Sequence, residues 1–473
     1  SLASALAVRG HLGAVMAATE RTPLVGTPRG HPALDTAFRV RLLTAIASLA
    51  EGYDIGIVNG ALVSMQRDLQ LSNLQVGLAV AMTVIFSAMA VIASGSLADV
   101  LGRKLAIGVG SLALVIASVI WALCHDFATL LLARAMLGVG LGIGIATVTI
   151  YISEVAPAHS RGFYSSLEDL FLNIGIPLGF IASALLVGYP NDWRIMVGLG
   201  AIPAAVVAIA VLTPYFPESP RYLLTVGRTQ EAEQVLLELL HGDKEEAGRV
   251  MASWRHSTEE TCTWGEAWQE FTGGHRKQAI AGFGLGFMCM LGGITVATTF
   301  STMMLTGMGM TERDAINATV VIGILKMMAI LVSAFVLMDR WGRRPLLILS
   351  GASMCASSVL MAFVCSQGLG TTWAVIGIIL FSAGFSVGIG PANFVYIAEI
   401  FGTRVRSKGV SVSLFMSRFV AFFYALLIPV ALEVYGVTGI WVFLIFMNAI
   451  TTVFFIMCCP ETKGFTLEQM SSA

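Results

Sequence analysis

Charged residues are scarce in this chain. Only 12% of its 473 residues are Asp, Glu, Lys or Arg, whereas soluble domains carry about 25%. The net charge of -1 gives no electrostatic basis for binding nucleic acid. Hydrophobic residues make up 56% of the chain and the mean hydropathy is +0.81. The few polar side chains cannot cover the surface of a molecule of this length in water. We therefore expect an integral, multi-pass membrane protein in contact with the lipid bilayer.

Residue patterns that carry enzyme chemistry are also missing. The seven cysteines show no metal-ligand spacing, and the seven histidines avoid the middle of the apolar runs. No nucleophile–base pair is recognisable, and the glycine-rich stretch Gly138–Gly144 lies inside an apolar run rather than after a strand. The sequence therefore predicts neither an enzyme nor a metal or cofactor site.

Apolar runs of about 20 residues recur along the whole chain, and each is long enough to cross the hydrocarbon core. Backbone groups cannot stay unpaired in lipid, so we predict helices. The predicted spans are 42–65, 75–98, 104–124, 127–151, 165–188, 193–215, 279–306, 314–338, 345–365, 372–397, 408–432 and 437–459. The expected fold class is an all-α membrane protein with about 12 transmembrane helices in two six-helix bundles.

Basic residues mark one side of the membrane. They follow spans 2, 4, 8 and 10, and the alternate short loops have few or none. The positive-inside rule then places both termini in the cytoplasm. The predicted organisation is a cytoplasmic tail (1–40), a six-helix bundle (41–215), a cytoplasmic helical linker (216–278), a second six-helix bundle (279–459) and a short cytoplasmic tail (460–473).

The two bundles share three motifs at nearly one separation in the chain. Asp99–Lys104 matches Asp339–Arg344, and Glu154–Gly162 matches Glu399–Gly409. The third match is Pro217–Arg221 with Pro460–Gly464. Such an internal duplication indicates two parallel halves related by an axis along the membrane normal.

Taken together, the motifs resemble the sugar-porter family of the major facilitator superfamily over nearly all of residues 40–470. The residues that carry this resemblance are Gly52-Tyr53-Asp54, Gly95 to Lys104, Arg134, Glu154 with Arg161-Gly162, Pro217 to Arg221, Asp339 to Arg344, Gly390-Pro391 with Glu399, and Pro460 to Gly464. Within that family the chain is most similar to the plant polyol/monosaccharide–proton symporters, through Gly52 to Gly56, Gly323 to Lys326, Arg418 and Asp169. The resemblance implies alternating access to a small polar solute bound between the halves.

Ionisable residues inside spans are costly, which makes each a functional candidate. Asp54 in span 1 and Arg134 in span 4 stand where the resemblance implies a proton-coupling pair. A carboxyl whose contact with a guanidinium changes between conformations can take up a proton on one side and release it on the other. The alternative is a static ion pair that fixes span 1 against span 4. Glu51, one turn before Asp54, is either a second proton site or a residue at the membrane edge.

Solute contacts are expected from Asp169, Asn173, Thr295, Thr299, Phe300, Asn393 and Phe394. Asp169 could instead pair with Lys326 or Arg418 for structure. The chain departs from the sugar-porter pattern in span 7, where Cys289 and Met290 stand in place of the usual pair of amide side chains. Losing amide donors and acceptors removes sugar hydrogen bonds, so a less hydroxylated, smaller or partly apolar solute is also compatible.

Acidic and basic residues cluster at the cytoplasmic ends of the spans, where the resemblance implies a gate network. Its members are Asp99, Arg103, Glu154, Arg161, Glu218, Arg221, Asp339, Arg343, Glu399 and Arg406. Helix capping and topology signals are compatible roles for the same residues.

The expected function is secondary active transport, as proton-coupled symport of a monosaccharide or polyol, with the proton as coupling ion and no other cofactor. The alternatives are a passive facilitator of a hexose or other small polar solute, and a transporter-like solute sensor. We expect a monomer in the plasma membrane, with a plastid or vacuolar membrane as alternatives.

Overall fold

The computed structural model describes residues 36–155, 161–213, 216–240, 242–257, 263–401 and 405–463. Within these ranges the regular structure is helical throughout, and no strand occurs. Most of the two predicted tails, 1–40 and 460–473, lies outside the described residues. The prediction of an all-α fold is confirmed.

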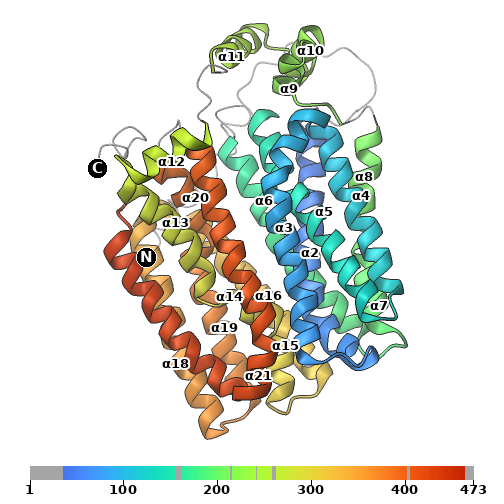
Figure 1. Cartoon of the computed structure of the whole chain (residues 1–473), viewed down its shortest axis with the longest axis vertical. Helices are drawn as coiled ribbons and strands as arrows, with labels where there is room; N and C mark the ends of the chain where they lie inside the picture. Colours follow the sequence, from blue (N-terminus) through green and yellow to red (C-terminus); the bar gives the residue numbers. More distant parts are fainter. Residues whose placement is uncertain are drawn as a thin grey trace, which may run out of the picture. The chain divides into compact units, whose positions relative to one another are not determined.

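The first half consists of six spans. Its helices are α2 (Thr36–Asp68), α3 (Asn73–Leu101), α4 (Arg103–Leu123), α5 (Phe127–Val155), α6 (Arg161–Leu186), α7 (Asp192–Leu199) and α8 (Ala201–Leu212). A capping box starts α3, because the Ser72 hydroxyl accepts from the backbone of Gln75 and the Gln75 side chain accepts from the backbone of Ser72. Helix α2 packs along α6, and α5 lies against α3 and α4 (Figure 1).

The second half repeats this plan with more interruptions. Its helices are α13 (Arg276–Leu291), α14 (Ile294–Thr299), α15 (Ser301–Gly307), α16 (Glu312–Val332), the π-helical turn η1 (Ser333–Leu337), α17 (Met338–Trp341), α18 (Arg343–Gln367), α19 (Thr371–Val387), α20 (Ile389–Ile400) and α21 (Arg406–Cys458). Helix α21 contains the last two predicted spans, which Gly436 separates with φ 65° and ψ -178°. Predicted spans 6, 7, 8 and 10 are each built from more than one helical element.

Four further helices connect the halves. They are α9 (Pro220–Thr225), α10 (Thr229–Leu239), α11 (Lys244–Ser257) and α12 (Trp264–Thr272). Helix α10 lies within the predicted helical linker and buries Leu236 and Leu239. Its Glu238 accepts a hydrogen bond of 3.3 Å from Thr36 at the start of α2. Helices α9 and α10 therefore lie at the end of the bundle where Arg103 and Arg343 begin α4 and α18, which we call the basic end (Figure 1).

The halves meet through equivalent pairs of helices. Span 2 (α3) packs on span 11 (the first part of α21), and span 5 (α6) packs on span 8 (α16). Helix α2 also contacts α14 and α15 near its end at Asp68, which we call the opposite end. This reciprocal pairing is what a duplicated six-helix unit produces.

Close backbone contact fixes α2 against α6, the two helices that carry Asp54 and Asp169. A Cβ added at Gly52 would lie 1.9 Å from the carbonyl oxygen of Leu172, and one at Gly175 would lie 2.4 Å from that of Leu49. Only glycine permits this approach, because any side chain would push the helices apart. The two acidic candidates are thus held on directly packed helices.

Candidate functional site

Asp54 and Arg134 differ in how firmly the fold holds them. The Arg134 side chain is buried at 3% exposure, donates from Nε to the Ala79 carbonyl at 3.0 Å, and stacks on the Trp121 ring at 4.6 Å. Asp54 is half-buried and interacts electrostatically with Arg134, but the two do not form an ion pair within 4.0 Å. Among the described residues Asp54 has no hydrogen-bond partner. The Arg134 guanidinium is thus held in place, whereas the Asp54 carboxyl can gain or lose a proton or a ligand contact.

A second group of charges surrounds Glu51, which is 4% exposed. Its carboxylate lies beside Gly144 of α5, where an added Cβ would meet Oε1 at 3.0 Å. It interacts electrostatically with Glu168 of α6 and with Arg418 of α21, which belongs to the other half. Glu168 in turn accepts a hydrogen bond of 2.8 Å from Thr149. Glu51 therefore lies inside the bundle, close to charged residues of both halves.

Asp169 connects the halves in a similar way. The Asn173 amide donates to its side chain at 3.2 Å and to its backbone carbonyl at 2.9 Å, one helical turn away. Lys326 of α16, across the interface, interacts electrostatically with the Asp169 carboxylate. Asn173 and Lys326 are both buried. Asp169 is thus an acceptor already oriented by an amide and balanced by a cation.

The candidates on the second half are less uniform. Thr299 and Phe300 are buried, at 8% and 0% exposure, and Thr295 is half-buried with its hydroxyl 3.7 Å from the sulfur of Met290. These three share the interrupted span 7. On α20, Asn393 is buried with an Oδ1 that has no hydrogen-bond partner among the described residues. Its neighbour Phe394 is 57% exposed, so the two side chains face different surroundings.

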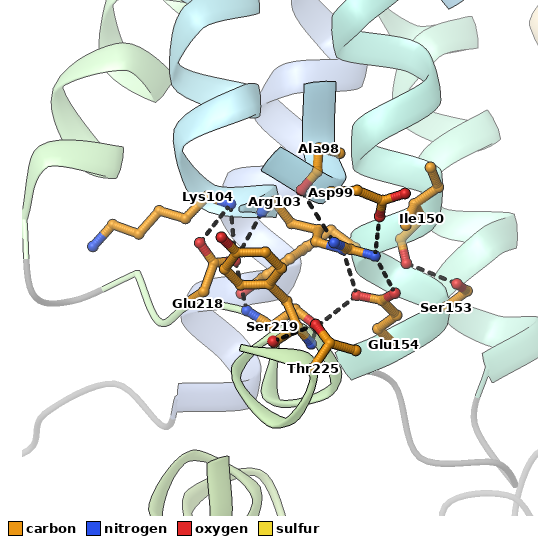
Figure 2. A network of polar contacts seen from close by, with 12 residues as sticks. Ala98, Asp99, Arg103, Lys104, Ile150, Ser153, Glu154, Glu218, Ser219 and Thr225 are labelled. Carbon is orange, nitrogen blue, oxygen red and sulfur yellow. Dashed lines mark hydrogen bonds and ion pairs between the residues drawn. The ribbon is translucent and has the colours of Figure 1, made fainter. Parts of the chain in front are cut away.

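At the basic end the first half contains a continuous polar network (Figure 2). Arg103 donates from Nε and Nη2 to the two carboxylate oxygens of Glu154 at 2.9 and 3.0 Å, and its Nη2 also lies 3.1 Å from Asp99. The Ser219 hydroxyl donates to Glu154 at 2.5 Å. Glu218 accepts from the backbone N–H groups of Arg103 at 2.9 Å and Lys104 at 3.1 Å. It therefore caps the start of α4, where Gly102 makes the turn with φ 88°.

The second half repeats the arginine–glutamate pair, the hydroxyl contact and the helix cap of this network. Arg343 donates to Glu399 at 2.9 Å, and the Thr462 hydroxyl donates to the other oxygen of Glu399 at 2.6 Å. Glu461 accepts from the backbone N–H groups of Arg343 and Arg344, each at 3.0 Å, and so caps α18. Gly342 makes the corresponding turn with φ 87°. Every one of these contacts joins residues of one half and its following segment.

Four residues predicted for the network are not among the contacts above. Arg221 is exposed. The side chains of Arg161, Asp339 and Arg406 lie outside what the structure describes.

The pKa values of the two capping carboxylates are shifted in opposite directions. Burial raises the pKa of Glu218 above its usual value, and the three backbone N–H groups of Ser219, Lys104 and Arg103 only partly offset this effect. Burial acts in the same direction on Glu461, but four backbone N–H groups outweigh it and hold the pKa of Glu461 below its usual value.

The hydroxyls of Ser219 and Thr462 were missed as network members, although the sequence contains the signal. Both follow the glutamate of a repeated Pro-Glu motif, so a hydroxyl recurs at equivalent positions. A third omission is Asn59 of α2, which is 1% exposed and bonds to α14 and α15 of the other half. No local pattern marks it, because its partners lie far away in the chain.

Polar contacts between the halves gather at the opposite end. The Ser64 hydroxyl donates to Glu312 at 2.7 Å, and Arg67 forms an ion pair with the same carboxylate. Asn73 at the start of α3 donates to Glu433 at 2.8 Å. Together with Asn59, these contacts join the halves at this end.

Comparisons with known proteins agree with this architecture. The sugar (and other) transporter family matches residues 40–473. Polyol transporter 5 of Arabidopsis thaliana is 32% identical over 462 residues, covering 92% of this chain and 85% of that protein. The putative metabolite transport protein YwtG of Bacillus subtilis (strain 168) is 31% identical over 432 residues, covering 90% of this chain and 92% of its own.

Solved structures show the same fold. The xylose transporter XylE from E. coli, in a partially occluded inward-open conformation, superposes with a TM-score of 0.79 at 20% identity, covering 91% of this chain and 99% of that one. Ten helices of the described residues are long and apolar enough to cross a membrane, one of them the doubled α21. The chain is a multi-pass integral membrane protein with the major facilitator fold, and it belongs to the sugar (and other) transporter family.

Proposed function

We propose that this protein is a proton-coupled symporter of a monosaccharide or polyol that works by alternating access. The observation that carries the proposal is the unequal pair of Asp54 and Arg134. The Asp54 carboxyl has no hydrogen-bond partner and lies near a guanidinium that is held in place. Such a carboxyl can change its protonation state when its distance from the cation changes during a cycle. A static structural pair would favour direct contact, and these two side chains do not make it.

The solute class follows from the acceptors between the halves. Asp169 can accept two or more hydroxyl hydrogen bonds, and Asn173 already orients it. Lys326 adds donors from the second half. The similarity to a polyol transporter in sequence and to a xylose transporter in fold supports a small polyhydroxyl solute. Because Cys289 and Met290 replace the amides of span 7, we expect fewer hydrogen bonds from the second half than from the first.

In this proposal the basic end faces the cytoplasm, which follows from the positive-inside rule. The hydrogen bonds and ion pair at the opposite end then close the outer side. Transport requires these contacts to break while others form at the basic end, as two rigid halves rock about the bound solute.

The test is uptake into proteoliposomes of purified full-length protein. A panel of labelled pentoses, hexoses and linear polyols is offered with and without an inwardly directed proton gradient. We expect at least one member to accumulate above its external concentration only when the gradient is present, and to move protons with it. Gradient-insensitive uptake that stops at equal concentrations would instead identify a facilitator. Binding without any uptake would identify a sensor.

A further inference from the structure

Arg134 and Asp54 both keep unused hydrogen-bonding capacity, although they lie close enough to interact electrostatically. Among the described residues, Nη1 of Arg134 is buried without a hydrogen-bond partner, and the Asp54 carboxyl has no partner either. A buried donor without an acceptor is costly. Direct contact between the two side chains would remove this cost, yet they form no ion pair within 4.0 Å. Another contact therefore holds the guanidinium away from the carboxyl.

The ring of Trp121, near the end of α4, makes that contact. The guanidinium carbon of Arg134 lies 4.6 Å from the ring centroid, and Nε donates to the Ala79 carbonyl of α3 at 3.0 Å. Trp121 is itself 2% exposed, and its indole N–H donates to the sulfur of Met65 at 3.5 Å. A cation is attracted to an indole face, most strongly where both are desolvated. The ring and the carbonyl thus hold the guanidinium from two helices.

Arg134 is the charged neighbour that acts on Asp54 in this structure. Helices α8, α14 and α15, which also pack against α2, carry no charged residue, and the charges of α3, α4, α9 and α10 lie at the basic end. Other charged residues inside the spans have contacts of their own, which are Glu51 with Arg418, Glu168 with Thr149, Asp169 with Lys326, Asp192 with Ser64, and Arg194 with Trp193. The position of the Arg134 guanidinium therefore sets the charge that Asp54 experiences.

We propose that Trp121 is a positioning residue for proton coupling, whose ring holds Arg134 away from Asp54 and so lets the carboxyl take up a proton more readily. An ion pair with a guanidinium favours the ionised carboxyl. An Arg134 side chain released from the ring could reach Asp54, and protonation would then need a more acidic solution. This inference rests on the proposed role of Asp54 in symport, but the protonation of Asp54 can be measured without any solute.

The test follows the protonation of Asp54 itself. A carbodiimide adds to a protonated carboxyl, and peptide mapping by mass spectrometry gives the modified fraction at Asp54 alone. Purified full-length protein is treated over a series of pH values, and the pH of half-maximal modification is compared between variants. Trp121→Met removes the ring and fills much of its space with a flexible side chain. Trp121→Phe keeps a ring, but one that attracts a cation less strongly.

We expect the pH of half-maximal modification to fall by about one unit in Trp121→Met, which is a tenfold rise in the proton concentration required. Trp121→Phe should shift it in the same direction by less, about twofold in proton concentration. Because a phenyl ring fits within the space of the indole, the Phe variant decides the question if Trp121→Met does not fold. An unchanged pH of half-maximal modification in either folded variant would overturn the proposal.

The matched control is Trp193→Met. Trp193 is also 2% exposed, the guanidinium carbon of Arg194 lies 4.3 Å from its ring centroid, and its indole N–H donates to Asp68 at 3.0 Å. This substitution should lower the midpoint of thermal unfolding but leave the modification of Asp54 unchanged. An equal shift in the control would mean that any loosening of the first half alters Asp54, and Trp121 would have no positioning role.

The uptake assay separates this inference from the proposed function. If a proton gradient drives uptake, the pH of half-maximal uptake in Trp121→Met should shift together with the modification of Asp54, while exchange of labelled for unlabelled solute continues. If the modification shifts but no solute of the panel is driven by the gradient, the proposed function fails and positioning by Trp121 stands. Gradient-driven uptake without a shift in the modification would leave the proposed function in place and exclude the role of Trp121.

Discussion

Arg103 donates two parallel hydrogen bonds to Glu154, and Arg343 and Glu399 occupy the equivalent positions in the second half with one such bond. The pairs also differ in solvent exposure. The side chains of Arg103 and Glu154 are 11% and 5% exposed, whereas those of Arg343 and Glu399 are 17% and 30% exposed. The duplicated network is therefore more strongly desolvated in the first half.

This asymmetry predicts unequal costs for the same substitution. Removing one partner of a buried ion pair costs up to about 3–5 kcal/mol, because the remaining charge has no compensation. We expect Glu154→Gln to lower the midpoint of thermal unfolding in detergent clearly more than Glu399→Gln does. Equal losses would mean that exposure does not set the strength of these pairs.

The capping glutamates predict opposite responses to pH. The pKa of Glu461 is lowered on folding, so its stabilisation is present above the ordinary glutamate value and is lost as pH falls through the folded value. The pKa of Glu218 is raised, so its contribution is greatest below the ordinary value and is lost as pH rises through the folded value. Thermal unfolding followed from acid to neutral pH checks both directions. As the pH falls, the natural protein should lose its advantage in unfolding midpoint over Glu461→Gln. The midpoint of the natural protein minus that of Glu218→Gln should instead increase.

Asp54→Asn should separate coupling from transport. An amide cannot take up the proton, so we expect accumulation driven by a pH gradient to disappear while exchange of labelled for unlabelled solute continues. Counterflow and gradient-driven uptake, measured on the same proteoliposomes, give the two readings. Accumulation at the level of the natural protein would remove Asp54 from the coupling step.

Asp169→Asn should affect solute affinity instead. Losing a charged acceptor for a solute hydroxyl costs about 1.5–3 kcal/mol, which corresponds to roughly 10–100-fold in KM. The remaining uptake should still respond to the proton gradient, because Asp54 is untouched. A loss of gradient response with unchanged KM would reassign Asp169 to proton movement.

Much of the fold could be predicted from local patterns. Hydropathy is sufficient to locate the spans because lipid requires apolar helices. The repeated motifs identify Arg103 with Arg343 and Glu154 with Glu399, since duplication preserves position. The turns at Gly102 and Gly342 were also predictable, and both glycines have the positive φ that such turns require.

The remaining features depend on contacts between distant segments. Gly293 could be suspected as a bend, but Phe300 has no residue nearby that breaks helices. At this interruption the Thr302 N–H donates to Asn59, which lies in another span more than 200 positions earlier in the chain. Likewise, whether Glu51 lies inside the bundle depends on the packing of α5, α6 and α21 around it, which its own helix does not reveal.

The capping of α4 by Glu218 and of α18 by Glu461 has a consequence for how the chain can be divided. Each six-helix unit is completed by the few residues that follow its last span, so each carries its own closing piece. A cut in the connector beyond Thr225 should leave two fragments that can be co-expressed and reassemble into a complete transporter. A cut before Pro217, or removal of everything from Pro460 onward, would take the closing piece away from one unit, even though no spanning helix is lost.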